Sequence, residues 1–185
     1  MRNLRRLIFV VAAIVSLAAT AIAFADSPNF NTHLAAREEV MPLGIVNNSL
    51  AQGQANFKLS DDGTTVQYKL IASNIDNAFM AHIHMGPAGV NGPIVVWLFP
   101  STTPGVIGPL GAGRHDGVLA EGTFTAADLV GPLQGHPLSD LLDAIDAGNA
   151  YVNVHTNDGV APINTGPGDF PGGEMRGQLG MHGHQ

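Results

Sequence analysis

The chain has 185 residues, with 15 acidic and eight basic side chains, no cysteine and a formal net charge of −7 at pH 7. This acidic balance argues against a nucleic-acid-binding protein, because the phosphate backbone repels a negatively charged surface. The absence of cysteine excludes a disulfide framework and removes thiolate from any metal site, so imidazole, carboxylate or carbonyl groups would have to bind an ion.

The first 25 residues are predicted to be a signal peptide. Three arginines within the first six residues precede an apolar run, and Ala23–Phe24–Ala25 supplies the small-x-small pattern of a cleavage site. Cleavage after Ala25 would leave residues 26–185, with five basic and 15 acidic side chains and a net charge of −10. We therefore expect an exported protein, periplasmic or extracellular, with no membrane attachment after cleavage.

The first half of the remaining chain reads as β-structure. Residues 26–33 are expected to form a loose leader before a domain that spans residues 34–180. A hairpin is indicated where two alternating segments flank Asp61–Asp62–Gly63, because these residues favour tight turns. The apolar run Ile94–Phe99 is typical of a strand covered on both faces. The strands predicted in this half are Leu34–Val40, Gln54–Leu59, Thr64–Leu70, Ala81–Gly86 and Ile94–Phe99.

The second half contains one predicted helix, Pro137–Ala147, whose leucines recur at helical spacing and which Gly148 ends. The Pro- and Gly-rich residues 100–117 are expected to form a long surface loop. The remaining predictions are strands at Gly122–Phe124, Tyr151–Thr156 and Glu174–Leu179, a loop or turn at 126–131, and a polar tail at 181–185. About seven short strands and one crossover helix predict an all-β fold, an antiparallel β-sandwich of Greek-key type.

Two of these strands carry histidines. Because side chains alternate between the faces of a strand, His82 and His84 project on one face, and His155 shares a face with Asn153 and Tyr151. If the two strands are neighbours, three imidazoles converge, which is typical of a copper or zinc site. The alternative is that these histidines are polar positions of the sheet, hydrogen-bonded to carbonyl groups or to a carboxylate, and only stabilise the fold.

Two charged residues on the last predicted strand are candidates for a supporting role. Glu174 and Arg176 lie on one face, where they could form an ion pair that fixes register. Alternatively, Glu174 orients a ligand histidine from the second shell and Arg176 attracts an anion, and Asn153 could act in the same way as Glu174. A fourth metal ligand could come from the remaining candidate histidines, which are His115, His136, His182 and His184.

Three stretches resemble a known domain family. The segment Ala81–Val95 is similar to the first signature of the chordin (CHRD) domain, and Tyr151–Thr156 followed by Pro171–Leu179 is similar to the second. The hairpin at 52–75 fits the opening of that domain, so the resemblance extends over residues 34–180. It implies a single-domain exported protein of the microbial type. The chain lacks the cysteine-rich modules of chordin, so growth-factor antagonism is not implied.

A less extensive resemblance is to the copper half of Cu/Zn superoxide dismutase, which is itself a β-sandwich. It implies a superoxide-dismutase-like sandwich in which His82, His84 and His155 are copper ligands and Arg176 guides anions. The bridging histidine, the zinc loop and the disulfide cysteines of that enzyme have no equivalents in this chain. The resemblance therefore implies a single metal site rather than dismutase activity.

These observations predict an exported protein that binds one metal ion, with copper ahead of zinc. The alternative is a non-enzymatic module with structural histidines, which recognises another protein or a cell-surface polymer through its acidic surface and the 100–117 loop. A second alternative is redox activity like that of superoxide dismutase. The sequence shows no Ser-His-Asp constellation and no glycosidase-type carboxylate pair, so no catalytic residue is assigned and the balance is against an enzyme.

Overall fold

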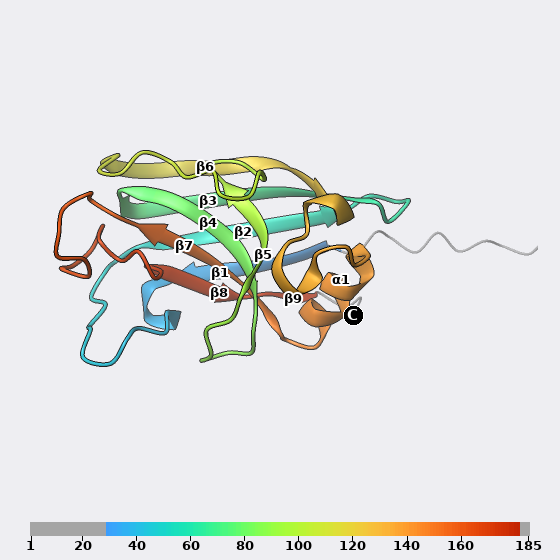
Figure 1. The fold of residues 1–185 in the computed structure, drawn as a ribbon, viewed down its shortest axis with the longest axis horizontal. Helices are drawn as coiled ribbons and strands as arrows, with labels where there is room; N and C mark the ends of the chain where they lie inside the picture. The colour runs from blue at the N-terminus through green and yellow to red at the C-terminus, as the bar shows by residue number, and fades with distance from the viewer. Residues whose placement is uncertain (1–28, 182–185) are drawn as a thin grey trace, which may run out of the picture.

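The computed structural model describes residues 29–181, and all structural statements refer to them. The predicted signal peptide and the tail histidines lie outside this range. The described chain forms one antiparallel sheet of nine strands (Figure 1). The strands are β1 (Asn29–Ala35), β2 (Gln52–Leu59), β3 (Thr65–Asp76), β4 (Ala78–Met85), β5 (Ile94–Phe99), β6 (Arg114–Thr125), β7 (Ala150–Thr156), β8 (Met175–Gln178) and β9 (Gly180–Met181).

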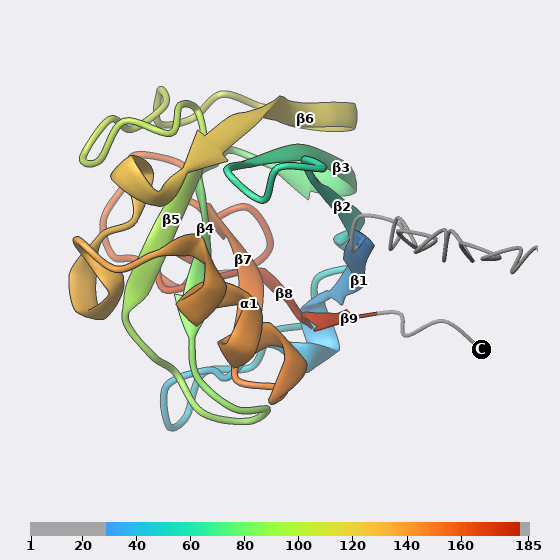
Figure 2. The same cartoon turned by 90° about the vertical axis from the view of Figure 1, so that its right-hand side faces the viewer.

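The sheet curls back on itself. Its strand order is β5-β4-β7-β8-β1-β2-β3-β6, with β9 paired to β1, and its two end strands, β5 and β6, come into contact. Two hydrogen bonds join β5 to the other end of the sheet: the Tyr68 hydroxyl on β3 donates to the Leu98 carbonyl at 2.7 Å, and the Val130 amide, just after β6, donates to the Val95 carbonyl at 2.9 Å. Figure 2 shows the strands following one another around the molecule. The predicted all-β antiparallel sandwich is confirmed, in a form that is nearly a closed barrel.

The core fills the space that the curled sheet encloses. Alternation on the β2–β3 hairpin buries Ala55, Phe57 and Leu59 as predicted, and Gly63 makes the turn with φ +70°. Each large apolar side chain that is fully buried contributes about 1.5–3 kcal/mol to stability.

One helix closes an end of the sandwich. The helix α1 (Leu138–Asp146) confirms the prediction, and its leucines at 138 and 141 and Ile145 face the core. Figures 1 and 2 show α1 lying across one end of the curled sheet. No helix within residues 29–181 is long and apolar enough to cross a membrane.

The N-terminal prediction needs a correction. Residues 29–33 are not a loose leader: they form most of β1, which pairs with β2 from Asn29↔Lys58 to Ala35↔Gln52. The predicted strand at Leu34–Val40 stops at Ala35, where a 3-10 helix over Ala36–Glu38 follows. Phe30 and Leu34 are buried on one face of β1, but the asparagines between and beside them make the alternation of apolar and polar residues hard to recognise in the sequence.

The loop predicted at 100–117 is also too long, because β6 begins at Arg114 and continues well before the predicted strand at Gly122–Phe124. This strand lies at the end of the sheet and pairs only with β3 among the described strands. An end strand of this kind buries few side chains, and Val118 is exposed. Its apolar pattern is therefore too sparse to indicate a strand.

Candidate metal centre

The two histidine strands are neighbours. Strands β4 and β7 pair antiparallel, with Met80 opposite His155, His82 opposite Asn153 and His84 opposite Tyr151. Residues on the other parity, such as Ile83 and Val154, belong to the apolar core. The predicted face assignment and the predicted adjacency are both confirmed.

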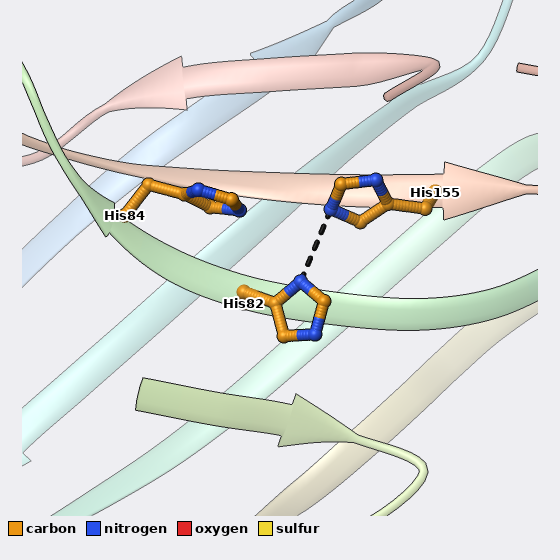
Figure 3. A group of neighbouring side chains, drawn as sticks. All are labelled: His82, His84 and His155. Carbon is orange, nitrogen blue, oxygen red and sulfur yellow. Dashed lines mark hydrogen bonds between the residues drawn. The ribbon is translucent and has the colours of Figure 1, made fainter. Parts of the chain in front are cut away.

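The three imidazoles converge on the face of β4 and β7 that points away from the apolar core, which we call the outer face (Figure 3). The Nδ1 atom of His82 lies 3.1 Å from the Nε2 atom of His155. Ring centroids are separated by 4.9 Å between His82 and His155, 5.5 Å between His82 and His84, and 5.7 Å between His84 and His155. One ligand atom of each residue lies within 4.8 Å of the other two.

The cluster is buried although it lies outside the core. His82, His84 and His155 are 0%, 7% and 6% exposed. The 86–93 loop contacts His84, whose Nδ1 lies 2.9 Å from the Gly92 carbonyl oxygen. The 157–174 loop contacts His155, whose Nδ1 lies 3.0 Å from the Pro171 carbonyl oxygen. The two loops leave opposite ends of the antiparallel β4–β7 pair, and together they cover the histidines.

These two carbonyl contacts fix the tautomers. A carbonyl oxygen only accepts, so His84 and His155 each carry a proton on Nδ1 and leave Nε2 with a free lone pair. This is the arrangement that metal-binding histidines commonly have, with the second nitrogen bonded to a carbonyl. The Nε2 of His84 is buried and has no hydrogen-bond partner among the described residues.

Burial keeps the imidazoles neutral. It lowers the pKa of His82 from 6.5 to about 2 and that of His155 from 6.5 to about 4, and in each case a neighbouring histidine lowers it further. The pKa of His84 is also lowered, again mainly by burial. Neutral imidazole is the form that binds metal, so the site is ready for an ion at neutral pH.

The donor set fits a metal ion. Two imidazole nitrogens at 2.0–2.1 Å from one tetrahedral ion lie about 3.3 Å apart, which is close to the spacing of His82 and His155. The third histidine offers a ligand atom within 4.8 Å of the other two. The cluster therefore has the donor types and the approximate spacing of a three-histidine site.

The predicted supporting residue Asn153 is part of the same buried face. It lies between His82 on β4 and Arg176 on β8 in the register of the sheet. A Cβ atom at Gly173 would lie 2.6 Å from both the Asn153 amide and a Glu39 carboxylate oxygen, so only glycine fits there. Burial raises the pKa of the Glu39 carboxyl, which the sequence did not single out.

Arg176 holds a loop in place. Its guanidinium donates to the Pro87 carbonyl at 2.9 Å and the Val90 carbonyl at 3.0 Å, and it lies 3.3 Å from the ring centroid of Tyr151. Tyr151 in turn stacks on His84, with centroids 5.0 Å apart, and its hydroxyl accepts from the Gly92 amide. Arg176 is 2% exposed, and a role in guiding anions stays a prediction.

Among the described residues, the Glu174 carboxylate accepts hydrogen bonds from hydroxyl and amide groups and not from a clustered histidine. Its carboxylate accepts from the Ser49 hydroxyl at 2.5 Å, the Thr156 hydroxyl at 2.6 Å and the Gly168 amide at 2.8 Å. Thr156 also accepts from the Phe170 amide, one residue before the carbonyl that contacts His155. Glu174 thus supports His155 through the 157–174 loop, and the predicted ion pair with Arg176 is absent from the described salt bridges.

Other histidines lie elsewhere. Neither His115 nor His136 belongs to the cluster, and His136 instead contacts Asp140 beside α1. The histidines at 182 and 184 lie outside the described residues. Trp97 is an aromatic neighbour that the sequence did not connect with the site: it pairs with His82 across β4 and β5, with ring centroids 4.2 Å apart.

Comparison with known proteins identifies one family. The family model of the CHRD domain matches residues 30–179, which is most of the chain. No curated protein and no solved structure matches the chain. The matched range includes all three clustered histidines, Arg176 and both loops that cover the cluster.

Proposed function

The chain belongs to the CHRD domain family, an extracellular-type module, and on this premise we propose that it is an exported protein that binds one metal ion, preferably copper, through His82, His84 and His155. The observation that carries the proposal is the convergence of three buried imidazoles whose ligand atoms lie within 4.8 Å of one another. A purely structural sheet face rarely gathers three neutral imidazoles without using all of their nitrogens.

The preference for copper rests on ligand chemistry. No cysteine, aspartate or glutamate joins the three histidines in the described cluster. For a set of nitrogen ligands, divalent copper binds more tightly than zinc, and imidazole suits both ions. Zinc remains the second candidate, because three histidines and a water also satisfy its tetrahedral geometry.

Export is supported by two features. The first 25 residues have the charge and hydropathy pattern of a signal peptide. The CHRD family adds the expectation of an extracellular-type location.

Superoxide-dismutase-like redox activity has less support. The histidines are almost fully buried, and the guanidinium of Arg176 is bonded to loop carbonyls. An enzyme of that type needs an open position for its small anion. Metal storage or transfer therefore fits this geometry better than turnover of a diffusing substrate.

The test is metal binding by the full chain, purified without an affinity tag and with His182 and His184 replaced by alanine. We expect one equivalent of Cu²⁺ by calorimetry and a nitrogen-rich paramagnetic resonance spectrum. The H82A/H84A double variant should lose the ion, whereas H136A, which removes an exposed histidine outside the cluster, should keep it. Retention of one tight equivalent by the double variant would refute the ligand assignment, and a wild-type protein without tight binding would leave the structural alternative.

A further inference from the structure

Two buried nitrogens of the histidine cluster, Nε2 of His82 and Nε2 of His84, have no hydrogen-bond partner among the described residues. His84 and His155 each bond a loop carbonyl through Nδ1, which leaves their Nε2 atoms for the proposed ion. The ion does not account for Nε2 of His82 in the same way, because His82 contacts His155 through Nδ1. In Figure 3 the free nitrogen of His82 lies on the side of its ring away from His155.

The proton of His82 has to move when an ion binds. His155 donates from Nδ1 to Pro171, so its Nε2 is an acceptor, and the 3.1 Å contact requires a proton on Nδ1 of His82 in the metal-free protein. An ion between these two atoms would need a lone pair on each of them. The single proton of neutral His82 must then sit on Nε2, which is the other tautomer.

Trp97 is the aromatic side chain of β5 that packs against the His82 ring. It is the chain's one tryptophan, and it is the cross-strand partner of His82 on β5. The two rings are nearly perpendicular, at 81°, with centroids 4.2 Å apart. In this arrangement an N–H of one ring can point at the π face of the other, which acts as a weak acceptor.

We infer that Trp97 is a positioning residue of the proposed metal site. When an ion occupies the cluster, the π face of its indole accepts a hydrogen bond from the Nε2–H group of His82. His82 is then a tautomer switch between a metal-free form, bonded to His155, and a metal-bound form, bonded to Trp97. The inference rests on the proposed function. It differs from it because it concerns the position of one proton rather than the presence of the ion.

Nitrogen-15 spectra of the histidine side chains test the switch in the full-length wild-type protein. We expect His82 to be protonated on Nδ1 without metal and on Nε2 after one equivalent of Zn²⁺, which is diamagnetic, while His84 and His155 keep their Nδ1 protons. Ring current from the indole should move the new His82 proton upfield. If Zn²⁺ binds and His82 is still protonated on Nδ1, the inferred role of Trp97 is refuted, whereas the proposed metal binding is not.

Variants at Trp97 test the energetic part. Trp97→Leu leaves a buried N–H without an acceptor, so we expect about tenfold weaker Zn²⁺ and Cu²⁺ binding and loss of the upfield shift. Trp97→Phe keeps a π face and should bind within about threefold of wild type. Phe99→Leu is the matched control, because Phe99 lies on the same strand but packs against the core. Equal affinities for wild type and Trp97→Leu would refute the inference, and a wild-type protein that binds neither ion would refute the proposed function as well.

Discussion

The strands β4, β7 and β8 have two buried faces that are built on opposite principles. On the inner face, Ala81, Ile83 and Val152 are fully buried and need no partner except apolar neighbours. On the outer face, His82 and Arg176 are as deeply buried, but each must find hydrogen bonds, because a buried polar group without a partner costs about 1–3 kcal/mol. Adjacent residues of one strand, such as Ala81 and His82, therefore lie in the apolar and the polar environment, respectively.

The difference lies in what covers each face. The sheet itself covers the inner face when it curls, so alternation along the strands is enough to build it. The outer face is covered by the 86–93 and 157–174 loops. Arg176 and Glu174 hold these loops in place through hydrogen bonds to their backbone atoms. The inner face thus supplies stability, and the outer face supplies a polar site whose geometry depends on anchored loops.

The largest effect is expected where a loop anchor is removed. Glu174→Ala leaves the Ser49 and Thr156 hydroxyls and the Gly168 amide without their acceptor, and we expect a loss of about 3–5 kcal/mol in the free energy of unfolding. Urea denaturation measures it. Glu121→Ala, at an exposed ion pair, is the control and should change stability by less than about 0.5 kcal/mol. A mild effect at Glu174 would mean that the 157–174 loop is held by other contacts.

An inner-face truncation should cost stability without touching the site. Ile83→Ala removes buried apolar volume between two ligand histidines in sequence, and we expect about 3 kcal/mol of destabilisation. The metal stoichiometry should stay at the wild-type value, because the side chain points away from the cluster. Urea denaturation of one sample and calorimetric metal titration of a second, folded sample check both statements. Loss of the ion by the folded variant would contradict the separation of the faces.

Acid should destabilise the metal-free protein through the outer face. The native pKa values of His82 and His155 are about 2 and about 4, both below the usual 6.5, so the unfolded chain binds more protons as the pH falls. Their contribution is complete above pH 6.5 and is lost below it. At about 1.4 kcal/mol per pKa unit, His155 alone accounts for about 3 kcal/mol by pH 4.

The measurement is the unfolding free energy of wild type and His155→Asn at several pH values, with a chelator present. The difference between the two proteins isolates the histidine from the carboxyl groups that titrate in the same range. The wild-type curve should fall more steeply below pH 6.5. Parallel curves would show that His155 titrates normally and that the outer face is wetter than the structure indicates.

The smallest effect on stability is expected at a ligand histidine. His82→Leu removes an unbonded buried nitrogen but also the donor to Nε2 of His155, and these two effects offset each other in part, so the metal-free protein should lose only about 1 kcal/mol. The same variant should not bind the ion. A loss as large as that of Ile83→Ala would instead make the histidines a structural part of the fold, as the alternative holds.

Period-two alternation was sufficient to predict the two faces and the histidines that share one of them. His82, His84 and His155 could be placed from sequence, because the parity of a strand does not depend on its partners. The pairing of β4 with β7 followed only from the family resemblance. The first part of β6 was missed because an end strand shows little alternation, and the first part of β1 was missed because its asparagines obscure Phe30 and Leu34.

The cover of the site could not be predicted from the sequence. The acceptors for His84 and His155 are the backbone carbonyls of Gly92 and Pro171, and every residue carries such a group. The partners of Arg176 and Glu174 are likewise loop atoms, so their charges suggested an ion pair that the fold does not make. Trp97 lies in a strand that is apolar throughout, and only the register of β4 and β5 reveals that it is opposite His82.

The position of β1 in the sheet has a consequence for how the molecule matures. This first strand pairs with β8 and β9, the last strands of the described chain, and β8 in turn joins β7. Pairing residues so distant in sequence closes a very long loop, which slows folding. The sheet therefore stays open until the C-terminal strands have been synthesised, and the loops over the histidines settle only then. If the cluster binds an ion as proposed, we expect that binding to be one of the last steps of folding.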